Sequence, residues 1–184
     1  MLPHTVFGMR NKGFLQVLAL CLRLSSLLLI PAFAAWATGR PFIFPSLGPS
    51  AFALTLGEDV VSARRIIGGH AVGIVCGFLA YHLLASGLAF HVFPVTWSIP
   101  DLRLAASGLF SLWLTTAGML LTHTRHSPAC ATTLIISLGL MPTLADCAVI
   151  LLAVASLCAT HRFLFRAHGL PHSIDARSAS ELRG

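Results

Sequence analysis

Four long, mainly apolar stretches dominate this sequence, and each is long enough to cross a lipid bilayer. They cover residues 17–37, 66–90, 104–122 and 145–165. A membrane-spanning helix needs about 20 consecutive, mainly apolar residues. Charged residues make up 10% of the 184-residue chain, whereas a soluble domain carries about 25%. We therefore predict an all-α membrane protein whose main solvent is lipid.

Two shorter apolar segments, 41–56 and 127–140, lie between the long ones. They are too short to span the hydrocarbon alone, and segments of this length are often re-entrant or interfacial. Each contains a helix-start signal, because Gly or Ser favours the N-cap and Pro favours the first helical position. We predict two short re-entrant half-helices in addition to the four transmembrane helices. The two signals are Gly48 with Pro49, and Ser127 with Pro128.

The spacing of these features indicates an internal repeat. The interval from Pro49 to Pro128 equals the interval from Ile66 to Ala145, where the following long helices begin. Each half then consists of a long helix, a half-helix and a second long helix, over about 14–90 and 101–166. With two spanning helices per half, both halves enter the membrane in the same sense, as in transporters with parallel repeats. Both half-helices would enter from the same side.

The transmembrane domain should occupy residues 14–166, between an N-terminal flank at 1–13 and a polar C-terminal tail at 167–184. Positive charge near helix ends usually marks the cytoplasmic side. In a four-helix topology the two sides are nearly balanced, and the basic tail favours cytoplasmic termini in a bacterial inner membrane. One side would carry Arg10, Lys12, Arg103, Arg162 and Arg166, and the other Arg40, Arg64, Arg65 and Arg125.

Two half-helices entering together would direct two positive dipole ends at one place, and helix N-termini bind small anions. Non-helical backbone at membrane depth is tolerated where it is buried in protein or lines a wet cavity. Nearby histidines add a side chain that titrates near neutral pH. We predict an anion site formed by Gly48, Pro49, Ser50, His70, Arg125, His126, Ser127 and Pro128.

A glycine stripe runs along the second long helix, where Gly69, Gly73 and Gly77 recur every fourth residue. Small residues at this spacing let helices approach closely, either within one chain or between two. The alternative function is therefore a non-transporting membrane assembly or sensor subunit with this stripe as its interface. Separately, the Gly–Pro and Ser–Pro pairs could be tight turns that join helices.

Several other classes of function lack support in the sequence. It contains neither HExxH nor GxSxG, and no pair of acidic residues lies within an apolar stretch, so we do not expect an enzyme. No Lys/Arg stripe follows a soluble segment, which argues against nucleic-acid binding. The five cysteines form no CxxC pair, and we expect no metal or cofactor. Because a chain this small lines a narrow pathway by itself, a homo-oligomer is expected.

Three motifs in this order resemble the HPP family of integral membrane proteins. They are Pro-x-x-Gly-x-Ser-Ala at 45–51, Arg-Arg-Ile-Ile-Gly-Gly-His at 64–70, and His-Ser-Pro-Ala-x-Ala-Thr at 126–132. The family is named for a His-Pro-Pro motif, whose middle position is Ser127 here. The resemblance implies four membrane spans and, because certain plastid and cyanobacterial members are linked to nitrite transport, a small anion such as nitrite. A small-anion transporter or channel is therefore the expected function.

Overall fold

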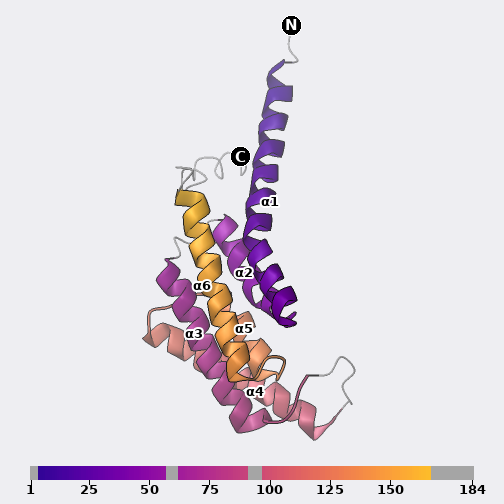
Figure 1. Cartoon of the computed structure of the whole chain (residues 1–184), viewed down its shortest axis with the longest axis vertical. Helices are drawn as coiled ribbons and strands as arrows, with labels where there is room; N and C mark the ends of the chain where they lie inside the picture. Colours follow the sequence, from indigo (N-terminus) through magenta and orange to yellow (C-terminus); the bar gives the residue numbers. More distant parts are fainter. Residues whose placement is uncertain (1–3, 57–61, 91–96, 167–184) are drawn as a thin grey trace.

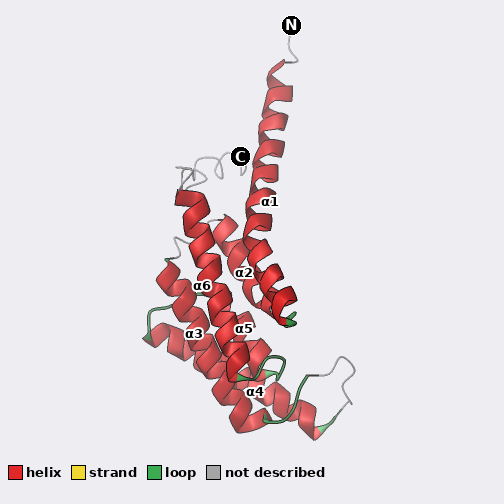
Figure 2. Cartoon of the chain, in the orientation of Figure 1, coloured by secondary structure: helices red, strands yellow, loops and turns green. Residues whose placement is uncertain are grey.

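The computed structural model describes residues 4–56, 62–90 and 97–166, with side chains between residues 14 and 164. Figures 1 and 2 show these parts as packed helices, with the first half of α1 projecting beyond the others. The described ranges contain no strand. The elements are α1 (His4–Thr38), α2 (Ile43–Leu56), α3 (Ala63–Ala80), the π-helix η1 (Tyr81–Ala85), α4 (Ile99–Leu121), α5 (Ala129–Ser137) and α6 (Leu144–Arg166).

Four helices are long and apolar enough to cross a membrane, which confirms the predicted number of long spans. They are Phe14–Thr38, Ala63–Ala85, Ile99–Leu121 and Leu144–Leu164. The whole of α1 has 35 residues, or about 52 Å at 1.5 Å per residue, which exceeds the roughly 30 Å of hydrocarbon. The predicted tail at 167–184 lies outside the described residues.

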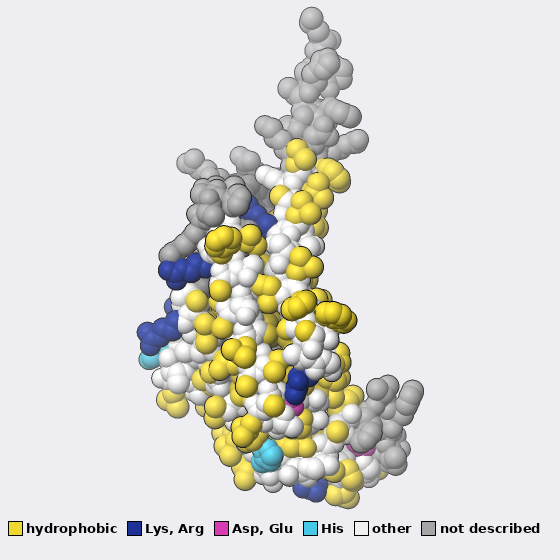
Figure 3. All heavy atoms as spheres, in the orientation of Figure 1, with side chains coloured by type: hydrophobic (Ala, Val, Ile, Leu, Met, Phe, Trp, Pro, Cys, Tyr) yellow, Lys and Arg dark blue, Asp and Glu magenta, His cyan; other side chains and the backbone are white. Residues whose placement is uncertain are grey.

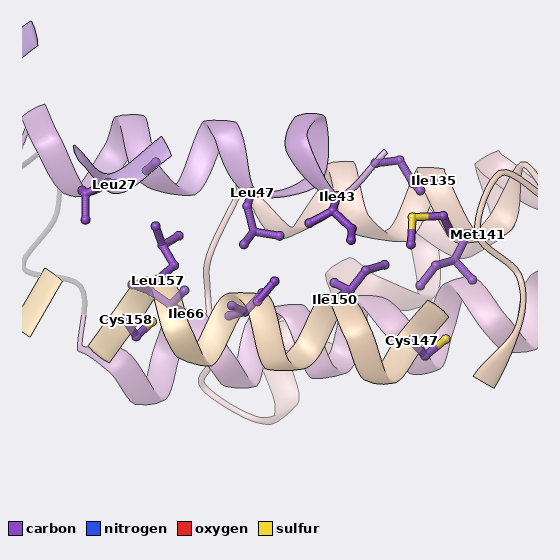
Figure 4. Close-up of a cluster of buried hydrophobic side chains, with 14 residues drawn as sticks. Leu27, Ile43, Leu47, Ile66, Ile135, Met141, Cys147, Ile150, Leu157 and Cys158 are labelled. Atoms are coloured by element: carbon purple, nitrogen blue, oxygen red, sulfur yellow. The ribbon is translucent and has the colours of Figure 1, made fainter. Parts of the chain in front are cut away.

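Contacts between helix ends show that the long helices do not all run in the same direction. Arg40, just after α1, forms an ion pair with Asp146 in the first turn of α6, so α1 and α6 are antiparallel. Near the other end of α6, Leu157 lies beside Ile66 from the start of α3 (Figure 4). Helix α3 is therefore also antiparallel to α6, and it runs in the same direction as α1.

The two short helices fit between the long ones with defined directions. Helix α5 runs parallel to α3, because Gly69 of α3 lies against Ala129 and Gly77 lies against Ile136. Helix α2 is antiparallel to α5, since α2 meets the region of residues 126–132 in reverse order. Successive helices from α1 to α6 thus alternate in direction, and α1 begins at the same end of the molecule where α6 terminates (Figure 1).

The structure does not confirm the predicted re-entrant half-helices. Helix α2 begins near Asp146, at the start of α6, and runs towards Leu157, nearer the other end of α6. Helix α5 runs along α3 from Gly69 towards Tyr81. Neither segment turns back to the side from which it came. The length argument assumed a lipid-facing segment, whereas α5 is enclosed by other helices and need not match the hydrocarbon thickness.

The structure does not confirm the predicted parallel repeat either. Each half has three helices that alternate in direction, so α4–α6 runs in the direction opposite to α1–α3. The proposed equivalence of the prolines also does not hold, because Pro49 lies inside α2 whereas Pro128 is the residue before α5. Helix α2 already begins at Ile43, and Pro49 interrupts one backbone hydrogen bond on an exposed face of that helix.

The main apolar core lies between α1, α2, α3, α5 and α6. Leu27, Ile43, Leu47, Ile150 and Leu157 are all fully buried there (Figure 4). Large apolar side chains on the outside remain exposed, and Figure 3 shows hydrophobic side chains over much of the visible face. Apolar surface on this scale is typical of a face covered by lipid.

An ion pair connects the C-terminal end of α1 to the start of α6. The Arg40 guanidinium donates to Asp146, whose carboxylate also accepts hydrogen bonds from the backbone N–H and the hydroxyl of Thr143. The Thr143 hydroxyl in turn accepts from the backbone N–H of Asp146 at 3.1 Å, which completes a capping box at the start of α6.

We expect this ion pair to contribute measurably to stability. In a double-mutant cycle with Arg40→Gln and Asp146→Asn, the coupling free energy should be about 1–2 kcal/mol. It should fall with added salt, because Arg40 is 31% exposed. Unfolding of the four proteins in one detergent measures the coupling. Strictly additive effects of the two substitutions would contradict a stabilising pair.

Candidate functional site

A cluster of five buried polar side chains lies where α2, α3 and α5 meet. The Ser50 hydroxyl of α2 is 2.9 Å from Nε2 of His70 and 2.9 Å from Nε2 of His126. On its other side, Nδ1 of His70 is 2.7 Å from the Thr132 hydroxyl, which is 2.6 Å from the Ser46 hydroxyl. We call these five residues the hydroxyl–imidazole cluster.

The cluster is closed to solvent. His126 is 4% exposed and the other four members are fully buried. Burying polar groups in an apolar environment is costly unless they are hydrogen-bonded. Across the described side chains, every buried nitrogen or oxygen has a hydrogen-bond partner. The cluster is therefore fully satisfied as it stands, which allows it to persist at membrane depth.

The glycine stripe of α3 explains how α5 comes close enough to build the cluster. A Cβ on Gly69 would lie 2.8 Å from the Cβ of His126, and one on Gly73 would lie 2.7 Å from the Thr133 hydroxyl. A Cβ on Gly77 would meet the Thr133 carbonyl oxygen at 2.7 Å. The stripe thus provides a contact within one chain, with α5 seated directly on the α3 backbone.

A neighbouring face of α5 makes a second polar contact, with α4. The hydroxyls of Thr115 and Thr133 are 3.1 Å apart, and the Ser107 hydroxyl donates to the Ser137 carbonyl oxygen at 2.8 Å. Neither contact includes a member of the hydroxyl–imidazole cluster. Interhelical hydrogen bonds of this kind hold membrane helices together, so this side of α5 has a packing role.

The structure brings together three of the eight predicted anion-site residues, namely Ser50, His70 and His126. The remaining five lie outside the cluster: Pro49, Arg125 and Ser127 are exposed, while Gly48 and Pro128 are half-buried. Ser127 also does not act as the predicted N-cap. The cap of α5 is Pro128, and this helix has no side-chain cap hydrogen bond.

The idea of two helix N-termini facing each other is also wrong. Helix α2 contacts the cluster from Ser46 in its first turn to Ser50, and both imidazoles bond to Ser50, one turn further along the helix. The backbone start of α5 alone adjoins the imidazoles, since the Ala129 N–H donates to the His126 carbonyl oxygen. One positive dipole end, not two, therefore lies near the imidazoles.

Sequence reasoning missed two members of the cluster, Ser46 and Thr132. Both are small hydroxyl residues inside apolar helices, where such residues commonly have only a packing role. A signal was available for Thr132, because it lies two turns after His126 in an otherwise apolar segment. Ser46 lies four residues before Ser50, on the same face of a helix, but that relation requires α2 to begin at Ile43 instead of Pro49.

The charged residue nearest to the cluster in sequence is basic, and the acidic residues of the described ranges lie elsewhere. The two acidic residues within the described ranges, Asp101 and Asp146, lie at the starts of α4 and α6, away from the start of α5. Arg125 is exposed immediately before His126. The described residues also include no group of three or more His, Cys, Asp or Glu side chains that could hold a metal ion.

Comparison with known proteins gives one match. The family model described as the HPP transmembrane region matches residues 10–167. No curated protein and no solved structure matches the chain. The match covers all six helices apart from the first residues of α1, and it includes every member of the hydroxyl–imidazole cluster.

Proposed function

The chain belongs to the HPP family of integral membrane proteins, and we propose that it transports a small monovalent anion, with nitrite as the leading candidate. The observation that carries this proposal is the buried Ser50 hydroxyl, which joins the imidazoles of His70 and His126 at membrane depth. Ionisable side chains within a membrane bundle mark substrate or ion pathways more often than they serve packing.

The chemistry of the cluster supports an anion as the cargo. Hydroxyl and imidazole N–H groups are hydrogen-bond donors that an oxyanion can accept from. The start of α5 adds a positive dipole end beside His126. A small anion such as nitrite could replace the hydrogen bonds that these groups now make to one another. A larger solute would need more space than the closed cluster offers.

Transport requires the cluster to open. Ser50 and His70 are fully buried, so the structure corresponds to a closed arrangement of the pathway. Helix α5 is the element best suited to move, because it has nine residues and its contacts include hydroxyl pairs on two faces. Exchange of the hydrogen bonds within the hydroxyl–imidazole cluster with an anion would give the pathway two states.

The distribution of basic residues supports cytoplasmic termini. With six alternating helices, the two ends of the molecule are no longer balanced in charge, and the richer end is the one where α1 begins and α6 terminates. By the positive-inside rule that end faces the cytoplasm, and the start of α5 opens towards it. This end carries Arg10, Lys12, Arg64, Arg65, Arg125, Arg162 and Arg166, and the other end carries Arg40 and Arg103.

The alternative function, a membrane assembly or sensor subunit, loses its proposed interface. Gly69, Gly73 and Gly77 are buried against α5 of the same chain, so they are not available to a partner. We retain a homo-oligomer within the transport proposal, because a single chain of this size can line a narrow path at most.

The direct test is anion uptake by proteoliposomes that contain the purified protein alone. Nitrite, nitrate, chloride and formate are compared at equal gradients, with protein-free vesicles as the reference for leakage. We expect saturable uptake that discriminates among these anions. Uptake indistinguishable from protein-free vesicles, from protein shown to be folded, would overturn the transport proposal.

Arg125 should act as an exposed attracting charge and not as a member of the closed cluster. We expect Arg125→Ala to lower uptake mainly at low ionic strength, because salt screens exposed charges over about 8–10 Å. The matched control is Arg162→Ala, an exposed arginine at the same end on α6. An equal loss in both variants, or a loss unaffected by salt, would contradict this role for Arg125.

A further inference from the structure

The hydroxyl–imidazole cluster is also one continuous hydrogen-bond chain. Its members follow in the order Ser46, Thr132, His70, Ser50 and His126, with successive distances of 2.6, 2.7, 2.9 and 2.9 Å. Each member is a hydroxyl or an imidazole, and both groups can donate and accept. His70 is bonded through both of its ring nitrogens, so it continues the chain instead of ending it.

This chain has two self-consistent polarities. In the first, the Ser46 hydroxyl donates to Thr132, Thr132 donates to Nδ1 of His70, Nε2–H of His70 donates to Ser50, and Ser50 donates to Nε2 of His126. In the second, every one of these hydrogen bonds is reversed, and His70 carries its proton on Nδ1. Both polarities are compatible with the same distances between heavy atoms, because these distances do not show which atom carries the proton.

We propose that this chain is a proton relay, so that the transported anion moves together with a proton. The inference rests on the proposed anion transport. When each member passes its proton to the next, from Ser46 towards His126, the first polarity becomes the second. One proton enters at the Ser46 oxygen, and one leaves from the other ring nitrogen of His126. The starting arrangement is restored when the cluster opens, because the hydroxyls can then rotate and each imidazole, with its hydrogen bonds broken, can release one ring proton and take up another on its other nitrogen.

The surroundings keep protons on this route. Ser46, Thr132, His70 and Ser50 are fully buried, so the closed structure offers no continuous water path beside them. The acidic residues of the described ranges are engaged elsewhere: Asp101 accepts from Ser98, and Asp146 pairs with Arg40. The two imidazoles are therefore the titratable groups of the cluster itself.

The two ends of the hydrogen-bond chain lie towards opposite ends of the helix bundle. His126, which is slightly exposed, lies at the start of α5 on the arginine-rich side. Ser46 lies in the first turn of α2, where the Ser46 N–H donates to the carbonyl oxygen of Phe42. That turn begins near the Arg40–Asp146 ion pair, at the far end of the molecule. A proton passing along the chain would thus move inward through the bundle.

Thr132→Val tests the relay, because it removes one hydroxyl of the chain and keeps the shape of the side chain. The matched control is Thr115→Val, a fully buried threonine whose hydroxyl bonds to Thr133 on a neighbouring face of α5. Proteoliposomes containing each protein receive nitrite or nitrate gradients at a potential fixed with potassium and valinomycin. Anion uptake and internal pH, reported by trapped pyranine, are recorded together. Nitrate is included because it does not cross membranes as a neutral acid.

We expect wild type and Thr115→Val to move protons together with the anion, and Thr132→Val to lose the proton signal and the response of uptake to a pH gradient. Anion uptake by wild type without proton movement would overturn the relay and leave the transport proposal intact. An unchanged proton-to-anion ratio in Thr132→Val would also overturn the relay. No anion uptake by wild type would overturn the transport proposal itself, and the coupling with it.

Discussion

Replacing Ser50 by Ala is expected to lower anion uptake by about tenfold or more. The substitution removes the hydroxyl that both imidazoles share, so Nε2 of His70 and Nε2 of His126 lose that buried partner. Leaving a buried polar group unsatisfied costs about 1–3 kcal/mol, and about 1.4 kcal/mol corresponds to a factor of ten. Initial uptake rates at equal protein incorporation measure the effect.

Ser111→Ala is the matched control for this experiment. Ser111 is also fully buried in a membrane helix, but its hydroxyl donates to Gly108 of the same helix at 2.7 Å. It therefore reports the effect of losing any buried serine hydroxyl in this bundle. If both alanine variants transport like wild type, Ser50 has no role in the pathway, and the site must be sought elsewhere.

The largest effect on stability is expected from Gly77→Ala. The added Cβ would lie 2.7 Å from the carbonyl oxygen of Thr133 and 3.2 Å from the Cβ of Ile136. Because the closer atom belongs to the backbone of α5, the two helices must separate. Overpacking of this kind costs about 1–3 kcal/mol, and we expect a lower unfolding temperature and loss of the contact that seats α5.

Gly108→Ala makes the same chemical change in another buried helical glycine. A Cβ at Gly108 would meet Leu134 and Leu138 at 3.6 Å, an ordinary contact distance. Removing a helix glycine should then be neutral or stabilising by up to about 0.5–1 kcal/mol. Thermal unfolding of both variants in the same detergent separates the two cases. Equal stability of the two would show that α5 does not lie against Gly77.

The long helices could be predicted from the sequence because their cause is local. A run of about 20 apolar residues spans the hydrocarbon whatever surrounds it, and all four predicted spans are present. The short helices depend on their surroundings instead. Helix α5 is enclosed by α2, α3 and α4, so its length carried no information about whether the chain turns back or continues across.

The candidate site was predictable in part for a similar reason. His70, His126 and Ser50 are polar residues in apolar segments, so they could be identified as candidate site residues from the sequence alone. Arg125 and Ser127 are adjacent in sequence to His126, but the turn before α5 directs them outward. Ser46 and Thr132 could be recognised only once α2 and α5 were placed antiparallel, with their hydroxyl faces in contact.

The expected helix directions also affected the proposed orientation in the membrane. With four crossings the basic residues divided almost equally between the two sides. With six alternating helices, Arg64, Arg65 and Arg125 join the termini on one side. The proposal of cytoplasmic termini rests on this distribution, because the positive-inside rule depends on which loops share a side.

The most direct test of the account is whether a small anion binds at the two buried imidazoles. Side-chain nitrogen resonances of ¹⁵N-histidine-labelled protein in nanodiscs would be followed during a nitrite titration, with assignments from single His→Gln variants. We predict saturable shifts for His70 and His126 and none for His82, which is exposed on η1. Absence of saturable shifts at His70 and His126, or equal shifts at His82, would contradict an anion site at Ser50.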